Sequence, residues 1–125
     1  MRQIRKAIFE TNSSSVHSLT MCSKSEYDAW INGELLLNEG WFDYPYDKQW
    51  LTREEAEAAV EEDRRKYALK EVGHEITDEI LREHEIYTSQ VWDDHFGDYY
   101  ETFEAEHTAS NGEAIIAFGY FGYDR

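Results

Sequence analysis

The sequence predicts an α+β fold, in which an antiparallel sheet built from N-terminal and C-terminal hairpins is covered by two or three helices. Segments with period-two apolar spacing, typical of half-buried strands, lie at both ends of the chain. Segments that begin with helix-capping patterns lie between them. The chain has 125 residues, of which 41% are hydrophobic, enough for a core without disulfides. We therefore expect a single α+β domain over residues 1–125.

The N-terminal hairpin is predicted from residues 3–10 and 16–22. In the second segment, His17, Leu19 and Met21 alternate with their neighbours, which is strand spacing. The five residues between the two segments are one threonine, one asparagine and three serines. These side chains hydrogen-bond to their own backbone and favour turns.

A short helix over residues 26–32 is expected next, because Ser23 and Glu26 have the spacing of a capping box. Residues 34–38 are predicted as a short buried strand, and residues 39–50 as a loop. The aromatic rings of this loop are expected to pack onto the body of the protein; the alternative is a surface for stacking or partner binding. The rings are those of Trp41, Phe42, Tyr44, Tyr46 and Trp50.

The clearest helix is predicted over residues 53–70, with Thr52 in a second capping box and Gly73 at its end. Its acidic residues lie early and its basic residues late, an order that suits the helix dipole. Its apolar stripe is thin, so we expect it on one face of a sheet. Thr77 caps a shorter predicted helix, residues 78–86.

The C-terminal hairpin is predicted from residues 101–109 and 113–121, joined by a turn that contains Asn111 and Gly112. The second arm is apolar on both faces, which predicts a central strand. The signals over residues 87–100 conflict, and both an irregular loop and a broken helix remain open.

The formal net charge of −15 disfavours direct binding to nucleic acid or to an anionic membrane surface, and favours a partner with a basic surface. No apolar run approaches the roughly 18 residues of a membrane helix, and the basic start is not followed by the apolar stretch of a secretory signal. The single cysteine, Cys22, fits a reducing compartment. We expect a cytoplasmic protein.

The acidic residues are concentrated over residues 71–106, which hold twelve acids and one base, Arg82. On ordered structure beside aromatic rings, such a surface can imitate a nucleic-acid backbone and dock on a basic groove. The alternative is that the acids only keep the protein soluble. The candidate binding residues are Glu79, Glu83, Trp92, Asp93, Asp94, Asp98, Tyr99 and Glu101.

The polar stretch near the N-terminus is the candidate for chemistry. A serine nucleophile needs a base within hydrogen-bond reach, and the candidates are Asn12, Ser14, Ser15 and His17. The structural alternative is a hydrogen-bonded turn with a half-buried histidine. The five histidines form no recognised ligand pattern with the cysteine or the acids, so we predict neither a metal nor a cofactor.

Two segments resemble a group of small proteins encoded by bacteriophages and by mobile or gut-associated bacterial genomes. The matching positions run from Phe9 to Ser18 ("FETNSSSVHS") and from Ala117 to Asp124 ("AFGYFGYD"). The resemblance implies a phage-type accessory protein and carries over no catalytic residue. If the two hairpins share a sheet, the two segments meet at one edge, where Gly119 and Gly122 allow close backbone approach.

Two functions follow. The first is a non-enzymatic phage-type protein that binds a host protein. Its most specific form is an acidic, nucleic-acid-mimicking inhibitor of a nucleic-acid-binding protein of the host or of a defence system, for example one of the CRISPR type. The second is a small enzyme, or a domain that binds a phosphate or nucleotide ligand, with its site in the N-terminal Ser/Asn/His loop.

Overall fold

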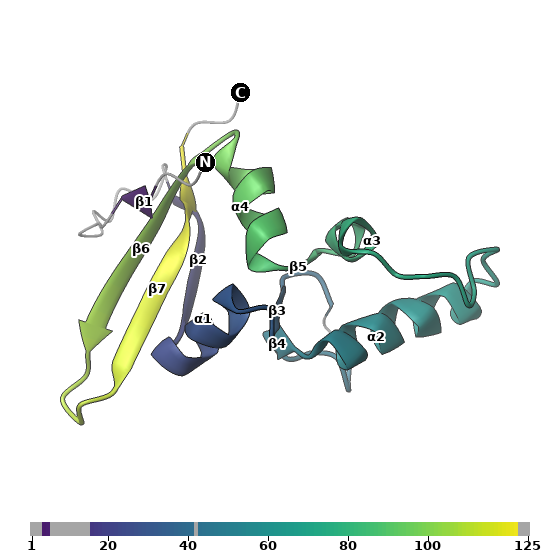
Figure 1. Ribbon diagram of the computed structural model, residues 1–125, viewed down its shortest axis with the longest axis horizontal. Helices are drawn as coiled ribbons and strands as arrows, with labels where there is room; N and C mark the ends of the chain where they lie inside the picture. The colour runs from purple at the N-terminus through teal and green to yellow at the C-terminus, as the bar shows by residue number, and fades with distance from the viewer. Residues whose placement is uncertain (1–3, 6–15, 42, 123–125) are drawn as a thin grey trace. The chain divides into compact units, whose positions relative to one another are not determined.

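The computed structural model describes residues 4–5, 16–41 and 43–122, with the backbone alone for residues 4, 5, 16 and 17. Backbone contacts divide the chain into two compact units (Figure 1). We call residues 1–28 with 92–125 the terminal unit and residues 29–91 the central unit. The fold is α+β, as predicted, with helices and two separate sheets. The single domain over residues 1–125 stays a prediction.

The terminal unit is built on a four-stranded sheet with the order β1-β6-β7-β2 (Figure 1). Strands β6 (Glu101–Thr108) and β7 (Ala114–Phe121) form the predicted C-terminal hairpin. Gly112 in its turn has a φ of +87°, a conformation that glycine adopts without steric strain. Strand β7 has a neighbour on each side, which confirms the central strand expected from its two apolar faces.

The prediction of an N-terminal hairpin is wrong, because its two strands do not pair with each other. Strand β1 (Ile4–Arg5) pairs in parallel with β6, and strand β2 (Val16–Ser23) pairs antiparallel with β7. The two strands therefore lie on opposite edges of the sheet. The C-terminal hairpin has two outer sides, one on β6 and one on β7, and the described strands β1 and β2 each pair with one of these sides instead of with each other.

Two helices contribute aromatic contacts to the core of the terminal unit. Helix α1 (Lys24–Ile31) begins in the predicted capping box, with the Glu26 amide donating to Ser23 Oγ at 3.2 Å. Its Tyr27 ring meets the Phe118 ring edge-on at 5.3 Å. Helix α4 (Ser89–Gly97) resolves the region where the sequence signals conflict. Its residue Phe96 stacks on Tyr120 of β7 at 4.1 Å between ring centres.

The central unit contains a three-stranded sheet with the order β4-β3-β5. The strands are β3 (Leu36–Asn38), β4 (Trp50–Leu51) and β5 (Ile86–Tyr87), and the helices are α2 (Arg53–Lys66) and α3 (Asp78–Glu83). Only β3 was expected as a strand. The core here is mainly aliphatic and comprises Leu36, Leu51, Ala56, Val60, Leu81 and Ile86.

Helix α2 begins as predicted, with both hydrogen bonds of the Thr52 capping box formed. It ends at Lys66 rather than near Gly73. The chain leaves the helix through Ala68, whose φ is +50°, and the Leu69 amide then donates to the Arg64 carbonyl at 2.9 Å. The helix is therefore ended by a left-handed residue that no glycine marks in the sequence.

None of the helices in the described part of the chain combines the length and the apolar character that a membrane-crossing segment needs.

Candidate interaction surfaces

Six of the eleven acidic residues of the terminal unit lie on α4, on β6 or between these two elements. They are Asp93 and Asp94 on the helix, Asp98 after it, and Glu101, Glu104 and Glu106 on the strand. The sequence contains no lysine or arginine between Arg82 and Arg125. This stretch of chain therefore supplies no permanent cation of its own to balance its carboxylates.

The aromatic candidates of this region separate into one surface ring and one core ring. Tyr99, just after α4, is 65% exposed and is available to a partner. Trp92 is only 1% exposed and packs against Phe118 at 5.7 Å between ring centres. Trp92 is therefore a core residue, and its place among the candidate binding residues is corrected. Helical periodicity explains this, because Trp92 and Phe96 are four residues apart on the inward face of α4.

The other predicted acids, Glu79 and Glu83, lie on α3 in the central unit. The contiguous acidic region of the sequence is thus divided between the two units. In the central unit several carboxylates have basic partners. Arg82 Nε donates to Glu79 Oε1 at 2.9 Å, and Arg53 Nε donates to Glu57 Oε2 at 2.6 Å.

Arg53 is the centre of the largest of these groups. It also pairs with Asp78 and donates to the Ile76 carbonyl at 2.7 Å, so it joins α2 to the start of α3. Burial alone lowers the pKa of Arg53, but the hydrogen bonds to Glu57 and Asp78 outweigh it and raise the pKa. The guanidinium of Arg53 therefore stays charged, and its positive charge faces the carboxylates of Glu57 and Asp78.

A second pair lies at the start of α2, where Lys48 contacts Glu55. The hydrogen bond from Lys48 lowers the pKa of Glu55, and the bond from the Thr52 amide acts in the same direction. Both bonds favour the ionised carboxylate. The acidic member of the capping box is therefore ionised at neutral pH.

The N-terminal candidates for chemistry are only partly within the described residues. Asn12, Ser14 and Ser15 lie outside them, and His17 is described by its backbone in β2. The register of β2 and β7 places Ser18 opposite Tyr120. The end of the segment Phe9–Ser18 thus pairs with the segment Ala117–Asp124, as expected for segments that share a sheet. The catalytic role of these residues stays a prediction.

Gly119 is the position where this pairing is tightest. A Cβ atom built on it would lie 2.0 Å from the Ser18 carbonyl oxygen and 2.9 Å from Cζ of Phe103. Glycine is therefore needed here for close approach of the strands, as the sequence predicts.

Cys22, on the same strand as Ser18, is 8% exposed. Burial, with the nearby Glu26 charge, raises the pKa of its thiol to about 12, so it is protonated and a poor nucleophile at neutral pH.

One organising residue has no clear signal in the sequence. Asn38, at the end of β3, is buried and its side-chain amide donates to the carbonyls of Trp41, Tyr46 and Lys48 at 2.8–2.9 Å. Its side-chain oxygen accepts from the amides of Gly40 and Trp41. The Asn38 side chain thus holds the loop that follows β3 in place through hydrogen bonds to its backbone.

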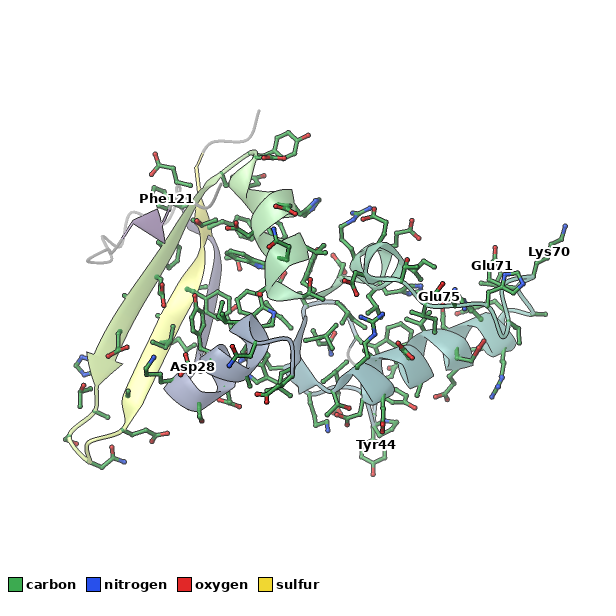
Figure 2. All side chains as sticks on the ribbon, viewed as in Figure 1. Asp28, Tyr44, Lys70, Glu71, Glu75 and Phe121 are labelled. Atoms are coloured by element: carbon green, nitrogen blue, oxygen red, sulfur yellow. The ribbon has the colours of Figure 1, made fainter. Side chains whose placement is uncertain are left out.

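The rings of this loop divide between core and surface. Trp41 packs against the aliphatic core and Trp50 against Trp30, so these two bear out the expectation of a packed loop. Tyr44 is 88% exposed, and Figure 2 shows it projecting away from the ribbon. Of Trp41, Trp50 and Tyr44, only Tyr44 therefore fits the alternative of a ring exposed for stacking or partner binding.

In the described part of the chain, no group of three or more His, Cys, Asp or Glu side chains is arranged to hold a metal ion. Compared with protein-family models, with curated protein sequences and with solved structures, the chain shows no match to any of the three.

Proposed function

We propose that the protein acts by binding a protein with a basic, nucleic-acid-binding surface, and that the acidic segment of the terminal unit is the contact region. We define this segment as residues 93–106. The observation that carries the proposal is the charge of this segment, six carboxylates and no lysine or arginine, on an ordered helix and strand. Fixed carboxylates on ordered backbone resemble the regular charges of a nucleic-acid strand.

The exposure of these residues supports a direct contact. Asp94, Asp98 and Glu106 are exposed to solvent, and the exposed ring of Tyr99 lies beside Asp98 in the chain. Tyrosine supplies large contact area at protein interfaces with little loss of side-chain freedom. A basic groove that normally holds nucleic acid offers partners for both features, because arginine pairs with carboxylates and stacks on rings.

The resemblance of the segments Phe9–Ser18 and Ala117–Asp124 to phage-type proteins suggests the biological setting. An accessory protein that imitates nucleic acid would occupy the groove of a host or defence protein, including one of the CRISPR type, and exclude its substrate. Electrostatic steering would make association fast at low salt and would weaken it as salt is raised.

The test is capture from a bacterial lysate on the immobilised protein at low and at high salt, followed by competition with double-stranded DNA. We expect a nucleic-acid-binding protein to be captured at low salt and displaced by the DNA. The triple variant Asp94→Asn, Asp98→Asn and Glu106→Gln should lose this capture.

The matched control is Glu54→Gln, Glu62→Gln and Glu83→Gln, which removes the same number of exposed carboxylates from the central unit. It should retain the captured protein. Equal loss with both triple variants would overturn the assignment to the terminal unit. Failure to capture any basic protein at low salt would overturn the proposed function itself.

A further inference from the structure

The turn at residues 43–46 of the central unit carries an exposed ring that neither the core nor the acidic segment explains. The Tyr46 amide donates to the Asp43 carbonyl at 2.8 Å, which closes the turn. Tyr44, inside the turn, is 88% exposed, more than any other exposed large hydrophobic residue that the structure describes, and it projects away from the ribbon (Figure 2). It has no hydrogen-bond or ring partner in residues 16–41 and 43–122. The ring therefore contributes little to the stability of the fold.

The backbone is held on both sides of this turn. The buried Asn38 side chain donates to the Trp41 carbonyl before the turn and to the Lys48 carbonyl after it, at 2.8 and 2.9 Å. The backbone amide of Asn38 also donates to the Gln49 carbonyl at 2.8 Å. A partner that covers the Tyr44 ring therefore has little backbone to order, which lowers the entropic cost of binding.

The exposure of Tyr44 contrasts with the packing of other rings in the same loop. Trp41 packs against the aliphatic core, Trp50 packs against Trp30, and Tyr46 is partly buried. The loop thus turns these rings toward the protein, and Tyr44 differs from them. Tyrosine is among the residue types that carry most of the binding energy at protein interfaces, because it supplies a large contact area with little loss of side-chain freedom. The position of the Tyr44 ring therefore fits a contact with another molecule.

The charge beside the ring indicates the kind of molecule that it contacts. Asp43 and Asp47 are both exposed, one residue before Tyr44 and three residues after it. Neither has an ion pair with any side chain that the structure describes. The nearest base in the sequence, Lys48, contacts Glu55 instead. The ring is therefore flanked by two carboxylates that favour a positively charged group on the partner.

We propose that residues 43–47 bind an arginine side chain of a partner protein, which stacks on the Tyr44 ring and donates hydrogen bonds to a flanking carboxylate, of Asp43 or Asp47. A guanidinium is planar, so its face stacks on an aromatic ring while its edge donates to a carboxylate. A lysine ammonium has the charge but no plane to stack. An anionic ligand would be repelled by both carboxylates, and an apolar ligand would bury them without a partner. Arginine is thus the side chain that matches the ring and the carboxylates together.

This contact is independent of the proposed function. Residues 43–47 belong to the central unit, and the acidic segment belongs to the terminal unit. General attraction of a cation to a chain with a net charge of −15 favours arginine and lysine alike. A preference for arginine that is measured at Tyr44 itself therefore reports this contact, whether or not the acidic segment binds a partner.

The first experiment is an NMR titration of the full chain, labelled in its tyrosine rings, with the blocked pentapeptide Gly-Arg-Gly-Arg-Gly or its lysine counterpart. The spectrum of the Tyr44→Phe variant identifies the Tyr44 signal. We expect this signal to shift saturably, with a dissociation constant at least about threefold lower for the arginine peptide. Tyr67, 62% exposed and beside Lys66, is the control ring and should shift little. A Tyr44 shift no larger than that of Tyr67, or equal dissociation constants for the two peptides, overturns the proposal.

The second experiment separates the ring, the flanking carboxylates and the acidic segment. With the Asp43 amide signal as the readout, Tyr44→Ala should raise the dissociation constant of the arginine peptide at least about threefold. The Asp43→Asn/Asp47→Asn variant, followed at the Tyr44 signal, should raise it by a similar factor. The control is the triple variant of the acidic segment described above, which should leave the response at Tyr44 in place. An equal rise in the control, or no rise in the first two variants, contradicts the assignment to residues 43–47.

Discussion

The two units treat their acidic residues differently. The central unit has 16 acidic and seven basic residues, and Lys48, Arg53 and Arg82 are bonded to carboxylates on or beside α2 and α3. The terminal unit has 11 acidic and five basic residues, and those bases lie at residues 2–24 and 125. In the central unit Arg53 joins two helices through its carboxylate partners, whereas the ion pair printed for the terminal unit, Lys24–Asp28, lies within one helix.

The cores of the two units also differ, in the type of side chain that forms them. Aromatic rings from α1, α4 and β7 pack together in the terminal unit, and aliphatic side chains on short strands and helices do so in the central unit. The comparison teaches that the central unit is a framework of small elements tied by polar contacts. The terminal unit is a sheet whose core is formed by aromatic rings.

Truncation of a core side chain should have the largest effect on the free energy of unfolding among the tests of this comparison. Phe118→Ala removes a 1% exposed ring that contacts Tyr27 and Trp92, so it should lower the free energy of unfolding by about 4 kcal/mol. Leu81→Ala in the central core should lower it by about 3 kcal/mol. Denaturant unfolding measures both.

The thiol of Cys22, buried in the terminal unit, shows whether the two effects are shared. If residues 1–125 form one domain, Leu81→Ala accelerates labelling of Cys22 as Phe118→Ala does. The exposed Tyr99→Ala variant serves as the control. Labelling that responds only to Phe118→Ala would contradict a single cooperative domain.

Removal of the Asn38 side chain should have the next largest effect, and it tests the polar ties of the central unit. Asn38→Ala leaves three carbonyls and two amides of the loop after β3 without this partner, so we expect a loss of about 3 kcal/mol. Denaturant unfolding and proteolysis of the loop measure it. The exposed Asn32→Ala variant should be nearly neutral; a similarly small effect at Asn38 would mean that the loop does not depend on this residue.

Replacement of Arg53 should have the smallest effect of the three. Arg53→Met removes the contacts to Glu57, Asp78 and the Ile76 carbonyl from a partly exposed site, so we expect a loss of about 1 kcal/mol. The loss should shrink at high salt. Arg65→Met, on an exposed position of the same helix, is the control. Equal effects of the two variants would show that the carboxylates of the central unit are not held by their basic partners.

The elements that the sequence predicts well are those with local signals. The capping box at Thr52 and the turn at Asn111-Gly112 are each contained within a few residues, and both are formed. The strands β4 and β5 were not predicted because each has two residues and exists only through pairing with β3. The end of α2 was missed because Ala68 takes a positive φ that its residue type does not indicate.

The candidate surface was predictable in composition but not in arrangement. The charge of residues 71–106 is visible in the sequence, but its division between two units depends on contacts between distant parts of the chain. The burial of Trp92 depends on the position of α4 over β7, which conflicting local signals did not reveal. The pairing of β2 was missed because the turn-forming residues that precede it suggested a hairpin with β1, whereas β2 pairs with β7.

The absence of a side chain at Gly119 has a consequence for the position of β2. Any larger residue there would displace the backbone of β2 at Ser18, and the ring of Phe103 on the other side would have to move as well. The position of β2 therefore depends on Gly119, a residue of the neighbouring strand β7 that has no side chain. An inherited change at this one codon would displace β2 while leaving every residue of β2 the same.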